Sequence, residues 1–139
     1  MPGISNSKLK LLYLMKIFLE ETDEQHDLSA AELLDRLASY GYPAERKSLY
    51  DDIETLRSFG LDIVMKKSKS YTYFLSQREF QLPELRLLVD AVQSSKFITH
   101  RKSAELIRKV ETLCSRHQAA DLQRQVYVAN RIKTMNESI

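Results

Sequence analysis

Apolar residues in the first 60 positions recur at the spacing of three helices. Nine of the eleven positions from Leu9 to Leu19 are apolar, so a helix over residues 8–21 is predicted to be buried on several sides or to lie at an interface. A second helix over residues 29–40 begins with the capping-box pair Ser29 and Glu32, and Gly41 ends it. Its apolar stripe is Ala30, Leu33, Leu34, Leu37 and Ala38. A third helix is expected over about residues 45–59, with the stripe Leu49, Ile53 and Leu56.

The period then changes to two, which is typical of strands. Residues 61–65 and 71–75 alternate and are rich in β-branched and aromatic side chains, and the polar segment 67–70 lies between them. This pattern predicts a β-hairpin. The turn between the second and third helices is short and contains Gly41 and Pro43, which is typical of a helix-turn-helix. Three helices followed by a hairpin is the order of a winged helix-turn-helix domain, expected over residues 1–80.

Helical spacing returns after position 81. Pro83 and Glu84 suit a first helical turn, and Leu85, Leu88, Val89 and Val92 form a stripe. A break near residues 97–99 precedes another predicted helix, with Leu106, Ile107, Val110, Leu113 and Cys114 on one face. Residues 119–124 are read as a short final turn and residues 125–129 as a strand or extended segment. The predicted fold class is mainly α with a small hairpin, in which residues 81–139 form a helical linker or dimerisation segment.

Composition narrows the class of protein. The 139 residues include one cysteine, which excludes an internal disulfide, so a reducing, cytoplasmic setting is expected. The apolar run near the N-terminus is too short for a bilayer and contains Lys16, and no signal peptide is recognised, so no membrane partner is expected.

The formal charge of +2 is unevenly distributed. Residues 23–41 carry five acids and one base, whereas residues 82–139 carry ten bases and six acids.

Candidate DNA contacts follow from the predicted helix-turn-helix. The second helix of this motif enters the major groove with its first residues, which here are Arg46, Lys47, Ser48 and Tyr50. Arg46 is suited to paired hydrogen bonds with guanine or phosphate, and the hydroxyls to phosphate or a base edge. Lys47 has a second interpretation, because Asp51 stands four residues later and suits an ion pair on a solvated helix face.

The hairpin carries the other candidate contacts. Lys66, Lys67 and Lys69 lie in a stretch with no acid between Asp62 and Glu79, so they are predicted to contact the DNA backbone. The alternative is that lysines on an exposed strand only prevent edge pairing.

The sequence also resembles a known family. Residues 44–63 resemble the recognition helix and first wing strand of DeoR-like winged-helix regulators, in the branch with a C-terminal WYL domain. Residues 29–40, 82–97 and 125–128 fit the same pattern, so the resemblance covers about residues 8–135. It implies a transcriptional regulator that binds duplex DNA.

Two positions depart from that family pattern, and its sensory domain is missing. Glu45 stands where a better helix cap is usual, and Asp51 stands where many members have a base. The sequence has no Trp and therefore no Trp-Tyr-Leu run, so the ligand-sensing barrel is absent, and an N-terminal part of a longer regulator is expected, with a natural short form as the alternative.

Other functions are weighed against this one. His26, His100, His117 and Cys114 are the reactive candidates for an enzyme, but no third partner, phosphate loop or metal-ligand cluster accompanies them. No enzyme activity, cofactor or metal is therefore expected. A winged helix that contacts only proteins is the main alternative to DNA binding. The excess of apolar positions in residues 9–19 and after residue 81 favours a homodimer.

Overall fold

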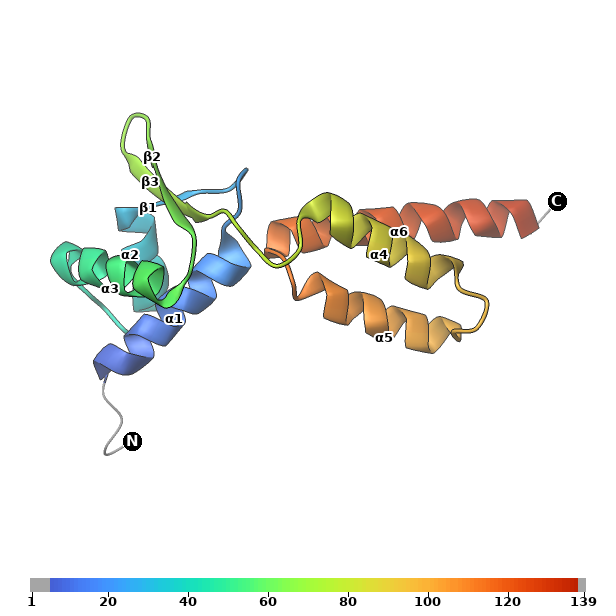
Figure 1. Ribbon diagram of the computed structural model, residues 1–139, viewed down its shortest axis with the longest axis horizontal. Helices are drawn as coiled ribbons and strands as arrows, with labels where there is room; N and C mark the ends of the chain where they lie inside the picture. The colour runs from blue at the N-terminus through green and yellow to red at the C-terminus, as the bar shows by residue number, and fades with distance from the viewer. Residues whose placement is uncertain (1–5, 138–139) are drawn as a thin grey trace. The chain divides into compact units, whose positions relative to one another are not determined.

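The chain divides into two compact units, Met1–Gln77 and Arg78–Ile139. The structure is a computed structural model that describes residues 6–137, and only the backbone of residues 133–137. The first unit contains α1 (Asn6–Glu21), β1 (Leu28–Ser29), α2 (Ala30–Ser39), α3 (Arg46–Phe59), β2 (Ile63–Lys67) and β3 (Tyr71–Leu75). The second contains α4 (Leu82–Ser94), α5 (His100–Glu111) and α6 (Arg116–Glu137) (Figure 1). The fold is mainly helical with a small antiparallel sheet, as the sequence predicts.

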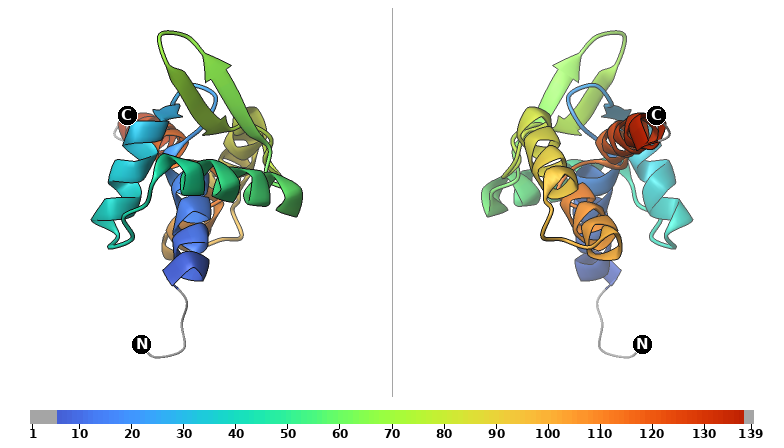
Figure 2. Two further views of the ribbon diagram at one scale, coloured as in Figure 1. Left: turned by 90° about the vertical axis from the view of Figure 1, so that its left-hand side faces the viewer. Right: turned by 90° about the vertical axis from the view of Figure 1, so that its right-hand side faces the viewer.

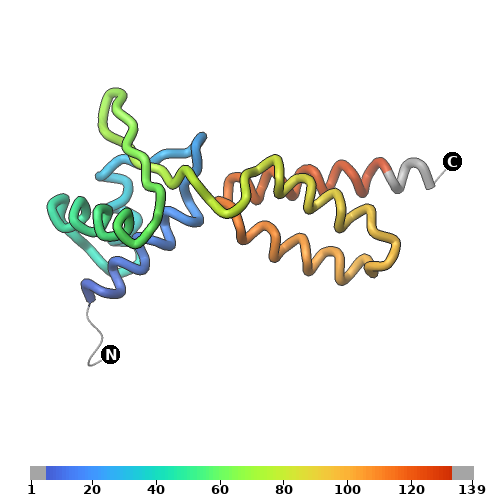
Figure 3. The backbone as a smooth tube through the Cα atoms, viewed as in Figure 1, coloured from blue at the N-terminus to red at the C-terminus, as the bar shows by residue number. Residues whose placement is uncertain are grey.

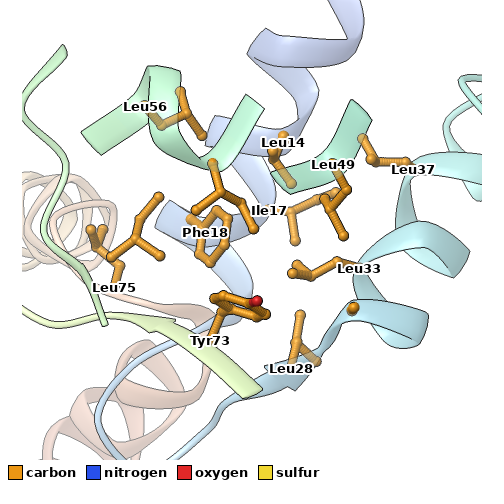
Figure 4. Close-up of a cluster of buried hydrophobic side chains, with 13 residues drawn as sticks. Leu14, Ile17, Phe18, Leu28, Leu33, Leu37, Leu49, Leu56, Tyr73 and Leu75 are labelled. Carbon is orange, nitrogen blue, oxygen red and sulfur yellow. The ribbon is translucent and has the colours of Figure 1, made fainter. Parts of the chain in front are cut away.

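The core of the first unit is formed by one face of each of its helices and by the base of its hairpin. Figure 4 shows side chains from α1, α2 and α3 converging around Phe18. The buried residues are Leu14, Ile17, Phe18, Leu28, Ala30, Leu33, Leu37, Leu49, Ile53, Leu56, Ile63, Tyr73 and Leu75. The predicted stripes of α2 and α3 supply six of them, which fixes both helices on α1.

The ends of α2 and α3 follow from local chemistry. Ser29 accepts a hydrogen bond from the backbone of Glu32, and the Glu32 carboxylate accepts one from the Ser29 backbone, which completes the predicted capping box. Gly60 ends α3 at a φ of 128°, a conformation that L side chains rarely adopt. The direction in which the chain leaves α3 toward β2 therefore depends on glycine.

The sheet has the strand order β1-β3-β2, and both pairings are antiparallel. Strand β1 is only two residues long and was not predicted, because its second residue, Ser29, is also the N-cap of α2 and so two residues give no alternating pattern. In β2 and β3, Ile63 and Leu75 pair at the buried base, whereas Lys67 pairs with Tyr71 at the exposed end. The hairpin thus projects beyond the helices of its own unit, as the left view in Figure 2 shows.

The second unit is a bundle of three helices that pack on one another, in which α5 runs antiparallel to α4 and α6 (Figure 3). Its buried cluster consists of Leu85, Val89, Ile107, Cys114 and Leu122. Helix α4 begins with the reciprocal pair Gln81 and Glu84, and Pro83 lies in its first turn. Within the residues that the structure describes, no helix is long and apolar enough to cross a membrane.

Three sequence predictions are wrong in this unit. Residues 119–129 form neither a short turn nor a strand, because they lie within the 22 residues of α6. Leu122 is fully buried against α4 and α5, so tertiary packing outweighs the β-favouring run Val126–Val128. Cys114 is buried as expected, but it lies in the turn after α5 rather than on that helix.

Candidate nucleic-acid interface

A groove of about 370 Å³ lies between the end of the hairpin and the first residues of α2 and α3. Residues 67–71 line one side, and residues 29–31, Arg46 and Tyr50 line the other. We call this the basic groove, because its lining contains Arg46, Lys67 and Lys69 and no acidic residue among those that the structure describes. A cavity with this lining is electropositive and is suited to phosphate.

Helix α3 contributes Arg46 and Tyr50, which lie one turn apart on the same face. Both side chains are exposed, while Leu49 between them is fully buried and holds the helix on the core. Glu45 occupies the N-cap position and makes no side-chain cap hydrogen bond. The first backbone N–H groups of α3 therefore stay available to an anion beside Arg46.

The hairpin contributes Lys67, Lys69 and an aromatic ring. The Lys67 ammonium lies 5.7 Å from the centroid of the Tyr71 ring, which is a cation–π distance, and both residues line the basic groove. Tyr71 is 48% exposed and was not identified from the sequence as a site residue. The alternation of β3 assigns it to the same face as Tyr73 and Leu75, but the hairpin projects beyond the core at this point.

The remaining predicted contacts lie outside the basic groove. Lys47 is exposed at the start of α3, and within the described part of the chain it forms no ion pair with Asp51. Lys66 emerges from the face of β2 opposite Lys67 and pairs in register with Thr72. The structure thus brings together Arg46, Tyr50, Lys67 and Lys69, and not Lys47 or Lys66.

Ser48 has a structural partner instead. Its hydroxyl accepts a hydrogen bond from the Lys10 ammonium of α1, and the same ammonium lies 3.1 Å from the Asp52 carboxylate. The Lys10 and Asp52 side chains are 13% and 19% exposed, so this ion pair is largely shielded from water. Ser48 and Asp52 therefore anchor α3 to α1 and set the direction of its exposed face.

A second polar cluster supports the hairpin. The Thr72 hydroxyl donates a hydrogen bond to the Asp27 carboxylate, which joins the segment before β1 to β3. That hydrogen bond, against a smaller opposing effect of burial, lowers the pKa of Asp27, and the positive charge of Lys66 acts in the same direction. Lys66 thus belongs electrostatically to this cluster.

The reactive candidates are dispersed over the fold. The His26 ring lies 2.8 Å from the buried Asp23 carboxylate in the turn after α1. Cys114 donates to the Glu111 carbonyl within the second unit. In the region that the structure describes, no three His, Cys, Asp or Glu side chains are grouped so that they could hold a metal ion.

Comparisons with known proteins give no match to this chain, whether with protein-family models, curated proteins or solved structures.

Proposed function

We propose that residues 1–77 form a winged helix-turn-helix domain that binds duplex DNA with sequence preference and acts in transcriptional regulation. In this proposal α3 enters the major groove, where Arg46 and Tyr50 contact bases or phosphates. The hairpin, as the wing, places Lys67 and Lys69 on the neighbouring backbone. The resemblance of residues 44–63 to DeoR-like regulators of the WYL branch supports the same function.

The observation that carries the proposal is the composition of the basic groove. Three bases from two separate segments of the chain converge on one cavity whose described lining has no acid to neutralise them. Residues 61–79 supply two of these bases, and α3 supplies the third although residues 44–60 have more acids than bases. The acids Asp51, Asp52 and Glu54 lie further along α3, and Asp52 and Glu54 are paired with Lys10 and Arg57.

The test is selection of bound duplexes from a random DNA pool by the full chain, repeated at low and at physiological salt. We expect enrichment of a defined sequence and an affinity that falls steeply with salt, because each neutralised phosphate releases counterions. Arg101→Ala removes an exposed base from α5, outside the basic groove, and should leave the selected sequence unchanged. Recovery of an unenriched pool at both salt concentrations would contradict the proposal.

One observation favours a second candidate function, a protein-interaction module without DNA binding. The exposed side of α3 also carries Asp51 and Glu54, and Phe59 at its end is 76% exposed. Acidic and apolar side chains of this kind are unfavourable against phosphate and suit a protein surface. The same selection separates the two functions, since this one predicts no saturable binding to any duplex.

We further propose that the protein binds DNA as a homodimer. Large apolar side chains remain exposed on the second unit, including Leu87 at 70%, Tyr127 at 66% and Ile132 at 54%. Burying them against a second copy is favourable, and a twofold dimer presents two α3 helices to half-sites one helical turn apart or a multiple of it. Light scattering should give twice the chain mass of 16.2 kDa, and a monomer at high concentration with and without DNA would contradict this.

A further inference from the structure

The basic groove contains two primary amines, those of Lys67 and Lys69, and its third base is Arg46. All three residues are exposed, and among the residues that the structure describes no ion pair engages any of them. Each amine is therefore open to solvent, and each shares the groove with two further positive charges that no carboxylate neutralises.

Other exposed lysines of the chain have different surroundings. The Lys16 ammonium lies 4.0 Å from the Glu20 carboxylate, and the Lys102 ammonium lies 3.5 Å from that of Glu105. These two lysine side chains are 51% and 57% exposed, so they are open to solvent, but the neighbouring carboxylate opposes the approach of an anion. Lys96 is exposed and in the described region forms no ion pair, but it lies outside the basic groove.

A groove with this charge distribution favours an anionic acylating agent. An acyl phosphate carries a phosphate group directly beside a reactive carbonyl carbon. Bases that bind the phosphate through charge-assisted hydrogen bonds therefore also hold the carbonyl carbon near a neighbouring amine. When one lysine of the groove is the nucleophile, the other lysine and Arg46 remain to bind the phosphate.

We propose that the basic groove is a lysine acetylation site, in which Lys67 and Lys69 react directly with acyl phosphates. The uncharged form of the lysine Nζ attacks the carbonyl carbon, and a C–N bond forms. The bond between the carbonyl carbon and the phosphate oxygen then breaks, hydrogen phosphate leaves, and the proton of the amine passes to water. The product is an acetyllysine, so the groove loses one positive charge with each modification.

The modification itself does not depend on DNA binding, but its effect on DNA rests on the proposed function. Each acetyl group removes one base that is proposed to contact a DNA phosphate. The slope of log affinity against log salt should therefore fall by about one for each modified lysine. DNA binding by this chain would then decrease as the concentration of acyl phosphate rises.

The test is incubation of the full chain with acetyl phosphate, followed by mass spectrometry of the acetylation rate at each lysine. A parallel reaction with N-hydroxysuccinimidyl acetate, which is uncharged, corrects for the exposure and intrinsic reactivity of each amine. The ratio of the two rates should be about tenfold higher at the two groove lysines than at the comparison lysines, because a groove of one charge sign concentrates its counterion. The comparison lysines are Lys16, Lys96 and Lys102.

Arg46→Gln removes the groove base that is not a nucleophile, and it should abolish most of the preference for acetyl phosphate. Arg108→Gln removes an exposed base from α5 and should leave the preference unchanged. The proposal is overturned if the rate ratio at Lys67 and Lys69 equals that of the comparison lysines, or if Arg46→Gln leaves it unchanged. Selective acetylation without a change in the salt slope for DNA would support the acetylation site and contradict the proposed contact between the hairpin and DNA.

Discussion

Arg46 is the side chain whose removal should most clearly change both the affinity for DNA and the base preference. It is exposed at the first position of α3, it lines the basic groove, and no ion pair of the described residues engages it. Arg46→Ala should weaken specific binding by about 1–3 kcal/mol and relax the base preference at one position of the site. Competition assays with single-base variants of the selected duplex measure both effects.

An unchanged base preference in Arg46→Ala would show that α3 is not oriented as proposed. The exposed Arg101 of α5 provides the control, because Arg101→Ala removes the same charge from the second unit. A similar loss of affinity in both variants would indicate only a general charge effect.

The Asp27–Thr72 hydrogen bond predicts a pH dependence. The native pKa of Asp27 lies below its unfolded value of about 3.9, mainly because Thr72 donates to the carboxylate. The resulting stabilisation is fully present above the unfolded pKa and is lost as the pH falls through the lower native pKa. Thr72→Val should raise the Asp27 pKa toward its ordinary value, as followed by carboxyl-carbon NMR. Thr55→Val is the control, because the Thr55 hydroxyl donates to the Asp51 backbone carbonyl, and it should leave the Asp27 pKa unchanged.

The composition of the candidate site was only partly predictable from individual residues. Helical spacing assigns Arg46 and Tyr50 to a common face, and the structure agrees. It does not reveal that Lys10 engages Ser48, because the two residues are 38 positions apart. Likewise, the alternation of β3 predicts that Tyr71 is a core residue. It is exposed because the hairpin extends beyond the core, which the sequence alone does not show.

Among the elements, the hairpin is the one proposed to contact the DNA backbone. The double variant Lys67→Ala/Lys69→Ala removes both bases that it contributes to the basic groove. Binding should weaken on all sequences alike, and the slope of log affinity against log salt should fall by about two, because each phosphate contact contributes about 0.9. Fluorescence anisotropy at several salt concentrations measures the slope. Lys66→Ala, on the opposite strand face, should change it less, and an equal change would contradict the distinction between these lysines.

The sequence predicted an element correctly where that element buries one apolar face. The prediction failed where an element is held by packing or strand pairing with distant parts of the chain. The stripe Leu49, Ile53 and Leu56 identifies α3 because all three residues are buried. The strand β1 has only two residues, and its pairing with β3 gives no periodic signal. Helix α6 has five exposed or half-exposed apolar residues in 126–132, so its sequence lacks a clear stripe although Leu122 is fully buried.

At the scale of the whole molecule, each unit has a buried cluster of its own. We therefore expect the two units to unfold as separate cooperative transitions. Leu56 and Leu85 are matched probes, because each leucine is almost completely buried, at 3% and 0% exposure, in the core of a different unit. Either substitution by alanine should destabilise its own unit by about 2–5 kcal/mol, through lost transfer free energy and the cavity that remains.

Residue-resolved thermal unfolding by NMR distinguishes the units. Leu56→Ala should lower the midpoint for amides of α2, α3 and β3 and leave those of α4 and α5 near their original temperature, and Leu85→Ala should do the reverse. Exposed alanine substitutions, Leu12→Ala and Leu113→Ala, are controls for the change of side chain, since these leucines are 53% and 39% exposed. If either core variant lowered both midpoints equally, the chain would be one cooperative unit. A DNA-binding defect in Leu85→Ala would then follow from unfolding, and the basic groove would need to be tested at lower temperature.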